Sequence, residues 1–448
     1  MSAHGPATRR RPYRVLQHRD FRRLWISQLV SLIGTQMQVV TINWHVYLLT
    51  GSPLALGVVG LTRVVPIILF SLWGGVVADR HDRRRVMLLT QSGMMLVALG
   101  LCALTLAGRE SLALLYLLNA LAAAAVAFDN PARQSLIPRL VPREDLPGAL
   151  SLNLTMFHAA MITGPALAGV LIAGTGAVLS QPPGSAAGGD AAGSTASLAW
   201  VYGLNALSFL GVLVALLTMR VSGRVERATE EEHPLAALRA GLRFVFTTPL
   251  MVWTMILDFF ATFFAGAMSL LPIFADRILG AGPAGYGLLV SAPGLGALVG
   301  SVYTSITPLP RRQGRVLLWA VGAYGISTIA FGLSRSYLLT FLALAASGLA
   351  DLISTVIRQT IRQLVTPDGL RGRMTSVNMI FFMGGPQLGE LEAGLVASAF
   401  ASVIVGVTVS VVSGGAMTLV AAIGVAFLAP WLRNYDIGEI ERWHSKNP

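Results

Sequence analysis

The sequence predicts an all-α integral membrane protein with twelve transmembrane helices in two pseudo-symmetric six-helix halves. Three observations predict this fold: an apolar composition, a regular spacing of long apolar runs and an internal repeat. Of the 448 residues, 54% are hydrophobic and only 12% are charged, and the mean hydropathy is +0.66. Soluble domains carry about 25% charged residues. A chain this long and this apolar therefore needs a bilayer as its solvent.

Twelve apolar runs have the length of a membrane-crossing helix, which needs about 20 residues. They cover residues 24–49, 54–78, 86–107, 111–133, 148–175, 198–218, 250–274, 283–304, 315–333, 337–359, 374–399 and 403–430. Helices are expected because lipid offers the backbone no hydrogen-bonding partner, and no strand-like alternation is visible. No charge separates the last two runs, so the turn between them is placed at residues 398–402 as a hypothesis.

The apolar runs divide the chain into five parts. These are a cytoplasmic N-terminal tail (1–23), an N-terminal six-helix half (24–218), a central cytoplasmic linker with an amphipathic helix (219–249), a C-terminal six-helix half (250–430) and a cytoplasmic C-terminal tail (431–448). The basic tail precedes a run too long for a cleaved signal peptide, so the first helix is expected to be retained. Residues 177–197 are rich in Gly, Ala and Ser and predict a flexible loop on the outer side.

The second half of the chain repeats the first. The segment that starts at Arg133 matches the segment that starts at Arg358, about half the chain later. The matched pairs include Gln134 and Gln359, Asn153 and Asn378, Gly164 and Gly389, and Gly169 and Gly394. Two parallel six-helix halves, related by an axis along the membrane normal, are the architecture of the major facilitator superfamily. The repeat therefore favours that architecture.

Arginines lie mostly in the loops on one side of the predicted helices. All of the 33 basic residues except Lys446 are arginine, and the net charge is +12. With an even number of spans both termini share one side, and the opposite loops hold only Arg109, Arg277 and Arg335. By the positive-inside rule, both termini are expected to face the cytoplasm. The same distribution suits anionic lipid, and not nucleic acid, as the partner of the positive charge.

The segment GVVADRHDRR, residues 75–84, lies between the second and third predicted spans. It resembles the loop 2–3 signature of the major facilitator superfamily, G-x-x-x-D-R/K-x-G-R/K-R/K. The resemblance implies a cytoplasmic latch, in which a carboxylate accepts hydrogen bonds from arginine or from a facing helix N-terminus. The latch residues would be Gly75, Asp79, Arg80, Arg83 and Arg84. Asp82 stands where the signature has a second glycine, which puts the turn geometry in doubt. The alternative is a loop that only sets the topology.

Three further segments resemble one branch of that superfamily. They are DNPARQSLIPRLVP at 129–142, EEHPLAALRAGLRFVF at 231–246 and NMIFFMGGPQLGELEAG at 378–394. These segments look like the bacterial exporter branch that includes the enterobactin exporter. The resemblance implies a transporter in the bacterial cytoplasmic (inner) membrane that exports a small molecule and is driven by protons.

Charged residues inside the predicted spans are costly and therefore usually functional. Asp129 and Arg133 are four residues apart on one helix face, and we expect an ion pair beside the latch. Arg63 in the second span and Glu390 in the eleventh lie at about the same depth. In the fold that the resemblance implies, these two spans are neighbours, so the pair would form an outer gate and couple it to protons. The alternative is that Arg63 reaches outward and Glu390 binds a proton alone.

Polar residues in the predicted spans are candidates for a substrate cavity or a proton site. They are Gln36, Asn43, Asn119, Asp258, Thr262 and Gln387. This set is polar but not strongly charged, which favours an amphiphilic small molecule, siderophore-like or drug-like, over a sugar or an inorganic ion. Asp258 has no obvious partner nearby in the sequence, so a proton role and a substrate role both stay open.

Other classes of function lack the residues that they need. Lys446 is the only lysine, which excludes a Walker A site and ATP-driven pumping within this chain. Cys102 is the only cysteine, so neither a disulfide nor a thiol metal site is expected. We expect no enzymatic activity, cofactor, metal or nucleic-acid partner, and a monomer that works with a small-molecule substrate, protons and the lipid bilayer. An importer or a lysophospholipid-type transporter of the same fold, or a non-transporting membrane sensor, are the alternatives.

Overall fold

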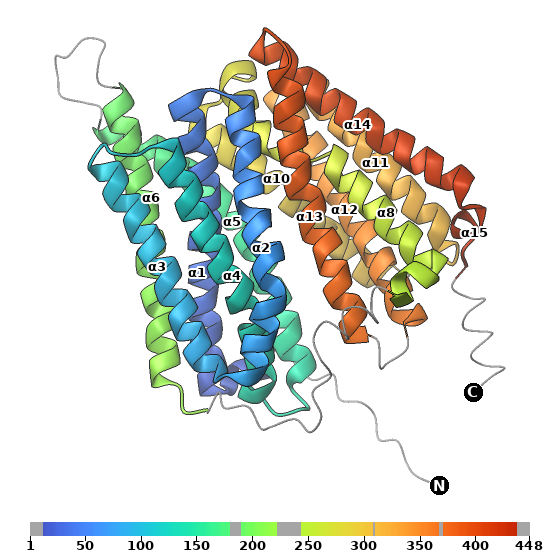
Figure 1. Ribbon diagram of the computed structural model, residues 1–448, viewed down its shortest axis with the longest axis horizontal. Coiled ribbons are helices and arrows are strands. Elements are labelled where there is room, and N and C mark those ends of the chain that lie inside the picture. The colour runs from blue at the N-terminus through green and yellow to red at the C-terminus, as the bar shows by residue number, and fades with distance from the viewer. Residues whose placement is uncertain (1–11, 180–189, 222–242, 308–309, 367–370, 437–448) are drawn as a thin grey trace.

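The computed structural model describes residues 12–179, 190–221, 243–307, 310–366 and 371–436 (Figure 1). Within these ranges every regular element is a helix. The first part of the chain forms η1 (Pro12–Gln17), α1 (Arg19–Thr50), α2 (Pro53–Arg80), α3 (Arg83–Leu106), α4 (Leu112–Leu140), α5 (Leu146–Leu179) and α6 (Asp190–Thr218). The second part forms α8 (Pro249–Phe264), η2 (Ala267–Leu270), α9 (Leu271–Ile273), η3 (Phe274–Ile278), α10 (Gly282–Ile306), α11 (Gln313–Leu333), α12 (Tyr337–Val365), α13 (Arg371–Ser398), α14 (Val403–Leu428) and α15 (Pro430–Arg433).

Each predicted span lies on one of these helices, or on the broken run from α8 to η3. Ten of the described segments are long and apolar enough to cross a membrane. Helices α1 and α13 are not among the ten, and they carry many of the polar residues that the sequence assigns to a cavity. Twelve crossings therefore remain a prediction. Residues 180–189 of the predicted outer loop, 177–197, and residues 222–242 of the predicted linker, 219–249, lie outside the described residues. The described ends of that loop are helical: residues 177–179 end α5 and residues 190–197 begin α6.

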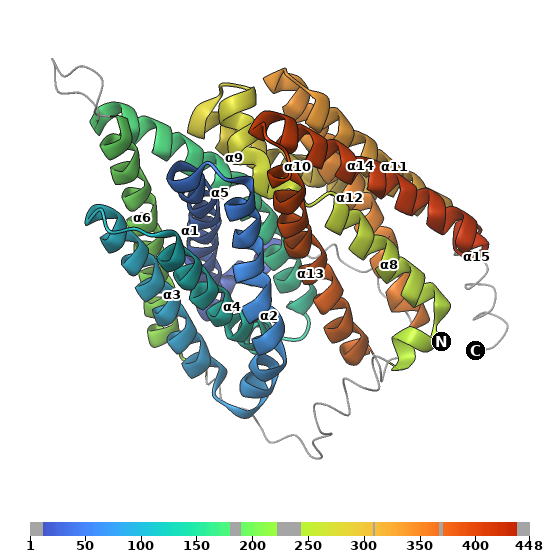
Figure 2. The same cartoon turned by 45° about the horizontal axis from the view of Figure 1, so that its top comes forward.

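The helices form two bundles that lie side by side (Figures 1 and 2). We call α1–α6 the N bundle and α8–α15 the C bundle. The end of the molecule that carries the turns at Gly51, Gly108 and Gly280 is called the turn end. The opposite end, which carries residues 83–85 between α2 and α3 and residues 311–312 before α11, is called the arginine end.

A short turn joins α1 to α2 and fixes the turn end of the N bundle. Gly51 has a φ of 57°, and its N–H donates to the Tyr47 carbonyl at the end of α1. This left-handed conformation suits glycine at a helix C-terminus. Ser52 then caps α2 by accepting a hydrogen bond from the Ala55 N–H, and Pro53 occupies the first turn. The two helices are therefore held antiparallel.

Glycines allow the two bundles to pack backbone against backbone. A Cβ atom on Gly394 of α13 would lie 2.7 Å from the Pro53 carbonyl oxygen and 3.0 Å from the Gly57 Cα of α2. A Cβ atom on Gly169 of α5 would lie 2.6 Å from the Pro283 carbonyl oxygen of α10. Gly169 and Gly394 are matched positions of the internal repeat. Each lies at the point of close approach in one of the two equivalent contacts between the bundles. Close approach at small residues is the usual way for membrane helices to associate.

The seventh predicted span is broken where it meets α13. Helix α8 ends at Phe264, and Gly266 follows before the short helices η2, α9 and η3. A Cβ atom on Gly266 would lie 2.6 Å from the carbonyl carbon of Gly389. Irregular backbone at membrane depth is tolerated only where protein surrounds it or where it lines a water-filled cavity. The break therefore lies where α13 packs against it.

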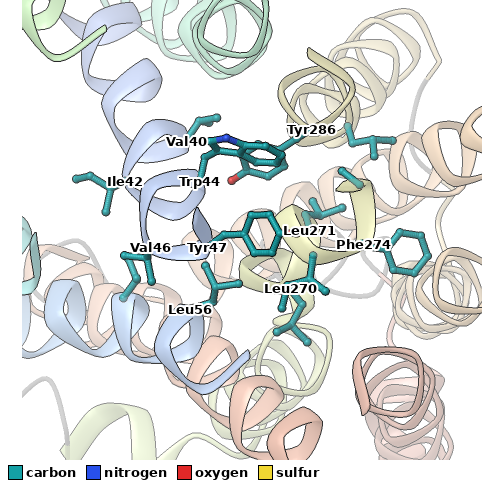
Figure 3. Close-up of a cluster of buried hydrophobic side chains, with 14 of the residues drawn as sticks. Val40, Ile42, Trp44, Val46, Tyr47, Leu56, Leu270, Leu271, Phe274 and Tyr286 are labelled. Atoms are coloured by element: carbon teal, nitrogen blue, oxygen red, sulfur yellow. The ribbon is translucent and has the colours of Figure 1, made fainter. Parts of the chain in front are cut away.

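The buried apolar side chains form separate clusters at the two ends of the molecule. The largest cluster is shared by both bundles: it contains Trp44, Tyr47 and Leu56 of the N bundle together with Phe274 and Tyr286 of the C bundle (Figure 3). Toward the arginine end each bundle has a core of its own. The cluster around Met87 contains N-bundle residues, and the cluster around Leu317 contains C-bundle residues. The described core thus joins the bundles at the turn end.

Candidate functional site

Four side chains close the turn end between the two bundles, and we call them the turn-end gate: Trp44, Tyr47, Asp276 and Tyr286. The Tyr47 hydroxyl on α1 donates a hydrogen bond to the Asp276 carboxylate on η3. The Trp44 ring stacks on the Tyr286 ring of α10, with centroids 5.4 Å apart and planes at 24° (Figure 3). The Arg277 guanidinium lies 6.0 Å from the centre of the Tyr47 ring. Aromatic pairs and buried charged hydrogen bonds are among the stronger contacts in proteins.

Sequence reasoning missed this gate. It placed the outer closure at Arg63 and Glu390, deeper along the helices. Trp44 and Tyr47 are three residues apart, on one face of a helix near its end, which is a signal that could have been used. Asp276 and Arg277 are charges at the edge of a predicted span, which is a second such signal.

The predicted pair Arg63 and Glu390 lies on helices that touch. A Cβ atom on Gly60, one turn before Arg63, would lie 2.6 Å from Glu390 Oε2, so the Glu390 side chain rests on α2. The two charges are close enough to interact electrostatically. They do not form one of the ion pairs within 4.0 Å that the described side chains make. The structure brings the two residues to one place, and their direct pairing stays a prediction.

A cluster of charges lies within the C bundle, and we call it the C-bundle charge cluster: the buried Asp258, Arg358 and Arg362, and the partly exposed Asp351. Arg358 Nη2 lies 2.8 Å from Asp258 Oδ1, and Arg362 Nη2 lies 3.4 Å from Asp258 Oδ2. The side chains of Asp258, Arg358 and Arg362 are at most 4% exposed. Asp351, 3.7 Å from Arg358, is 44% exposed. Burying a charge costs free energy unless an opposite charge lies beside it. The Asp258 carboxylate therefore compensates the buried charges of Arg358 and Arg362.

The spacing on α12 assembles this cluster. Ser354, Arg358 and Arg362 are four residues apart and therefore share one helix face. The Arg358 guanidinium donates to the Ser354 hydroxyl and, at 2.8 Å, to the Thr355 hydroxyl. Its contact with Asp258 is an ion pair without hydrogen-bond alignment, so Asp258 Oδ1 accepts no hydrogen bond from the described residues.

Asp258 therefore differs from its sequence-based interpretation. It has partners, but they come from α12, about 100 residues later, and no local pattern could have named them. Arg362 was missed altogether. Its spacing from Arg358 was the available signal: Arg362 lies one helical turn beyond Arg358, just past the end of the predicted span 337–359, so both share one helix face.

The N bundle also contains an acidic and a basic side chain within its helices, but their hydrogen-bond partners are neutral groups. Asp129 on α4 accepts hydrogen bonds from Thr90 Oγ1 at 2.9 Å and from Gln91 Nε2 at 3.0 Å, both on α3. Arg133 donates to Asn130 Oδ1 at 2.7 Å and to Gln28 Oε1 of α1 at 3.4 Å. Although both side chains are described, Asp129 and Arg133 form no ion pair within 4.0 Å. The expected ion pair is absent in this conformation because each charge is bound to other polar groups.

The loop between α2 and α3 is held by caps. Asp82 caps α3 by accepting hydrogen bonds from the Arg84 N–H at 2.9 Å and the Arg85 N–H at 3.4 Å. Its φ of −60° needs no glycine, which explains how an aspartate can stand where the signature has one. The Arg84 guanidinium donates to the carbonyls of Leu217 and Met219 at the end of α6. Arginine is favourable there because it binds the last carbonyls of a helix.

The other latch residues have varied surroundings. Arg83 donates to the carbonyls of Ala78 and Ser135, and Arg80 is exposed. The Asp79 side chain lies outside the described side chains. A Cβ atom on Gly75 would meet nothing within 4 Å in the described part of the chain, whereas one on Gly74 would collide with the Ala127 carbonyl of α4. In this conformation Gly74, and not Gly75, makes the close contact with a neighbouring helix.

The predicted cavity residues have different surroundings, and their shared role stays a prediction. Asn119 is buried between α4 and α2, where it donates to Thr62 Oγ1 at 2.8 Å, so it joins two helices of one bundle. Gln36 lies at the crossing of α1 and α5, because a Cβ atom on Gly164 would lie 2.5 Å from its Cβ. Thr262 Oγ1 donates to the Asp258 carbonyl and faces Gly385 of α13. Asn43 Oδ1 and Gln387 Oε1 are buried without a hydrogen-bond partner among the described atoms.

A second buried polar group was also missed, at the turn end of the N bundle. His45 Nδ1 lies 3.2 Å from the Tyr202 hydroxyl, and His45 Nε2 lies 4.0 Å from Glu110 Oε1. The His45 side chain is fully buried. It lies on α1 between Trp44 and Tyr47 of the turn-end gate. No metal-ligating group of three or more His, Cys, Asp or Glu side chains occurs in the described ranges.

Two apolar helix bundles that close at one end around aromatic and charged contacts define a multi-pass membrane transporter. The chain matches the family model described as transmembrane secretion effector over residues 11–447. It therefore belongs to this family of the major facilitator superfamily, in the branch of the enterobactin exporters.

Relatives of known name and solved structures agree with this assignment. The chain is 28% identical to the enterobactin exporter EntS of Citrobacter koseri over 391 residues, which cover 86% of this chain and 88% of the relative. It is 26% identical to the same exporter of Shigella boydii over 360 residues, which cover 80% and 81%. A bacterial homologue of the human lysosomal transporter Spinster, solved inward-facing and occupied, has the same fold: the TM-score is 0.72 at 17% identity, with 94% and 98% of the two chains covered.

Proposed function

We propose that this protein is a proton-coupled exporter that moves an amphiphilic small molecule, siderophore-like or drug-like, out of the bacterial cytoplasm by alternating access. In this proposal twelve helices cross the inner membrane in two six-helix halves, and the arginine end and both termini face the cytoplasm. The asymmetry of the apolar core carries the proposal: one shared cluster seals the turn end, and separate clusters lie toward the arginine end. That is the arrangement expected of a transporter open to the cytoplasm.

The latch would act in the opposite state. When the bundles rock so that the arginine end closes, Gly75 and Asp79 would meet the C bundle, and the turn-end gate would separate. The absence of close neighbours at Gly75 in the described conformation supports this assignment. Alternating access by rocking of two repeats needs a set of contacts at each end that form in turn.

Glu390 and Asp258 are our candidates for the proton site. Glu390 rests against α2 in the contact between bundles, so a change in its charge would act directly on that contact. Asp258 lies inside the C bundle and holds two arginines. A siderophore-like substrate with acidic groups could compete for these arginines, which would link substrate and proton at the C-bundle charge cluster.

Transport in inverted membrane vesicles tests the proposal. Vesicles with an acid interior should accumulate a catecholate siderophore or an amphiphilic drug from a test panel, and a protonophore should abolish the accumulation. Vesicles that lack the protein provide the baseline. Flux of the same compounds in the opposite direction would identify an importer. Binding without flux would identify a sensor.

Substitution in the latch provides a matched pair of variants. Asp79→Asn should reduce transport at least tenfold, because a neutral amide loses the charge-assisted contacts that close the arginine end. Asp82→Asn removes the same charge three residues away, but asparagine also caps helices well, so transport should persist. Equal activity of the two variants at equal expression would leave the loop as a topology signal.

Cysteine labelling in intact cells tests the orientation. In a Cys102→Ala background, Arg109→Cys places a thiol at the exposed turn end and Arg85→Cys places one at the arginine end. An impermeant maleimide should label the first variant in intact cells and the second only after lysis. The reverse pattern would invert the protein in the membrane.

A further inference from the structure

A groove runs along the outside of the N bundle between α1 and α6. Its volume is about 550 Å³, and Arg23 and Thr218 mark its place at the arginine end. The apolar side chains along it, Ile26, Val30 and Leu207, are each more than half exposed. All of its lining residues lie on α1 and α6, and none of them belongs to the turn-end gate or to the C-bundle charge cluster.

Small residues form the floor of the groove between α1 and α6. A Cβ atom on Gly211 of α6 would lie 3.6 Å from the Ser27 Cβ of α1, so the helices touch there through their smallest side chains. The groove extends along α6 from Leu207 to Thr218, or roughly 16 Å at 1.5 Å per residue. The hydrocarbon core of a bilayer is about 30 Å thick, so this length corresponds to one leaflet.

A positive charge stands at the mouth of the groove. Arg23 is exposed, and it directly follows the first turn of α1, which contains Arg22. Asp20 is the acid of that turn, and its carboxylate accepts hydrogen bonds from the N–H groups of Arg220 and Val221 just after α6. These bonds tie the ends of α1 and α6 together, so the mouth has a fixed width. The arrangement is an open, mostly apolar groove with a guanidinium group at its arginine end.

We propose that this groove binds one anionic phospholipid of the leaflet at the arginine end. One acyl chain lies in the groove over Ser27 and Gly211, and the phosphate is bound by Arg23. Arginine matches phosphate geometry, and basic residues near the membrane surface select anionic lipid. A second copy of the chain is the other conceivable occupant, but a stable interface buries at least about 1,200 Å², which is much more than a single narrow groove offers. The proposal does not depend on what the protein transports.

Native mass spectrometry of the full-length protein tests the headgroup contact. The purified protein is equilibrated with equal amounts of phosphatidylglycerol and phosphatidylcholine in detergent, and the retained lipid is weighed. The wild type should retain phosphatidylglycerol preferentially. Arg23→Gln should lower that preference about fivefold, the size expected for one arginine near anionic lipid. Arg433→Gln is the matched control, because it removes an exposed arginine near the same end of the C bundle. Equal losses in the two variants would contradict the proposal.

Filling the groove tests the acyl-chain contact. Gly211→Leu, and independently Ser27→Leu, should abolish retention of both lipids, whereas Gly424→Leu should not, because a Cβ atom there would meet nothing within 4 Å. Each variant is compared at equal yield of monodisperse protein, and the two filling variants guard against one that fails to fold. Unchanged lipid retention in the filled variants would overturn the proposal. A change from dimer to monomer on filling would show a second copy as the occupant and would also overturn it.

Discussion

Arg133 on α4 and Arg358 on α12 occupy matched positions of the internal repeat, yet their guanidinium groups bind different partners. Arg133 donates to the amide oxygens of Asn130 and Gln28. Arg358 lies 2.8 Å from the Asp258 carboxylate, which Arg362 also contacts. The duplication thus kept the cation in both bundles, but in this conformation a buried carboxylate contacts it only in the C bundle, as far as the described residues go.

The comparison teaches that the two bundles stabilise buried charge in different ways. In the N bundle, Asp129 and Arg133 are each bound to neutral groups, so the loss of one leaves the other with its hydrogen bonds. In the C bundle, the loss of Asp258 would leave two buried arginines without their shared counter-charge. An uncompensated buried charge is far more costly than a lost neutral hydrogen bond. The C bundle is therefore the more sensitive half.

The largest expected effect is that of Asp258→Asn. It should lower the free energy of unfolding by about 3–5 kcal/mol, the cost of breaking a buried ion pair. Asp129→Asn in the N bundle should cost only about 1 kcal/mol, because asparagine can still accept the hydrogen bonds of Thr90 and Gln91. Unfolding by dodecyl sulfate in mixed micelles measures both variants. Similar losses would remove the proposed difference between the bundles.

A double-mutant cycle isolates the ion pair itself. Asp258→Asn combined with Arg358→Gln should give a coupling energy of about 2 kcal/mol, within the range for contacting residues. The corresponding cycle in the N bundle, Gln28→Leu combined with Arg133→Gln, should give less than about 1 kcal/mol, because a hydrogen bond to an uncharged oxygen is weaker. The same unfolding measurement serves for both cycles. A larger coupling in the N bundle would reverse the comparison.

Sequence reasoning succeeded where one physical rule acts on many residues at once. Lipid forces every span to be long, apolar and helical, so all twelve predicted runs fall on helices or on the broken run from α8 to η3. Close packing forces glycine at both contacts between bundles, so Gly169 and Gly394 stood out in the repeat. The arginine contacts of Arg83 and Arg84 were not predicted in detail, because a helix end can accept an arginine from any nearby loop.

The candidate site was harder to predict because it depends on which side chains meet across helices. Asp258 on α8 contacts Arg358 and Arg362 on α12, and Asn119 on α4 donates a hydrogen bond to Thr62 on α2. The hydropathy and spacing of the spans carry no information about such contacts. A single polar residue in an apolar run is equally consistent with a cavity and with a hydrogen bond to the next helix. The sequence signal for the C-bundle charge cluster was the four-residue spacing of Arg358 and Arg362, which places both on one face of α12.

A smaller effect is expected for a charge pair that is divided between the two bundles. A cycle of Arg63→Gln and Glu390→Gln should give a coupling energy of about 1 kcal/mol, since measured couplings between membrane helices average about 0.6 and reach about 1.7 kcal/mol. Glu392→Gln is the control, because Glu392 lies two residues away on a different face of α13. Coupling of Arg63 to Glu392 as strong as to Glu390 would show that the contact is not specific. Each single variant should also reduce export in the vesicle assay, and the charge swap Arg63→Glu with Glu390→Arg should recover part of it.

The last effect, no larger than the preceding one, concerns the position of the polar groups in each bundle. The C bundle has its buried charge cluster inside, between α8 and α12, whereas the N bundle has His45, Tyr202 and Glu110 at the turn end. Tyr202→Phe removes the hydroxyl that lies 3.2 Å from His45 Nδ1 without changing the ring. It should cost about 1 kcal/mol of unfolding free energy, the net value of one buried hydrogen bond. Tyr303→Phe, on the exposed surface of α10, should cost nothing measurable.

The same variant tests whether this hydrogen bond supports the turn-end gate. His45 lies between Trp44 and Tyr47 on α1. In the Cys102→Ala background, Tyr202→Phe should therefore raise the maleimide reactivity of a cysteine placed at Thr50, on the rim of the turn-end gate. Unchanged reactivity together with a stability loss would show that the hydrogen bond stabilises the N bundle and has no part in closing the gate.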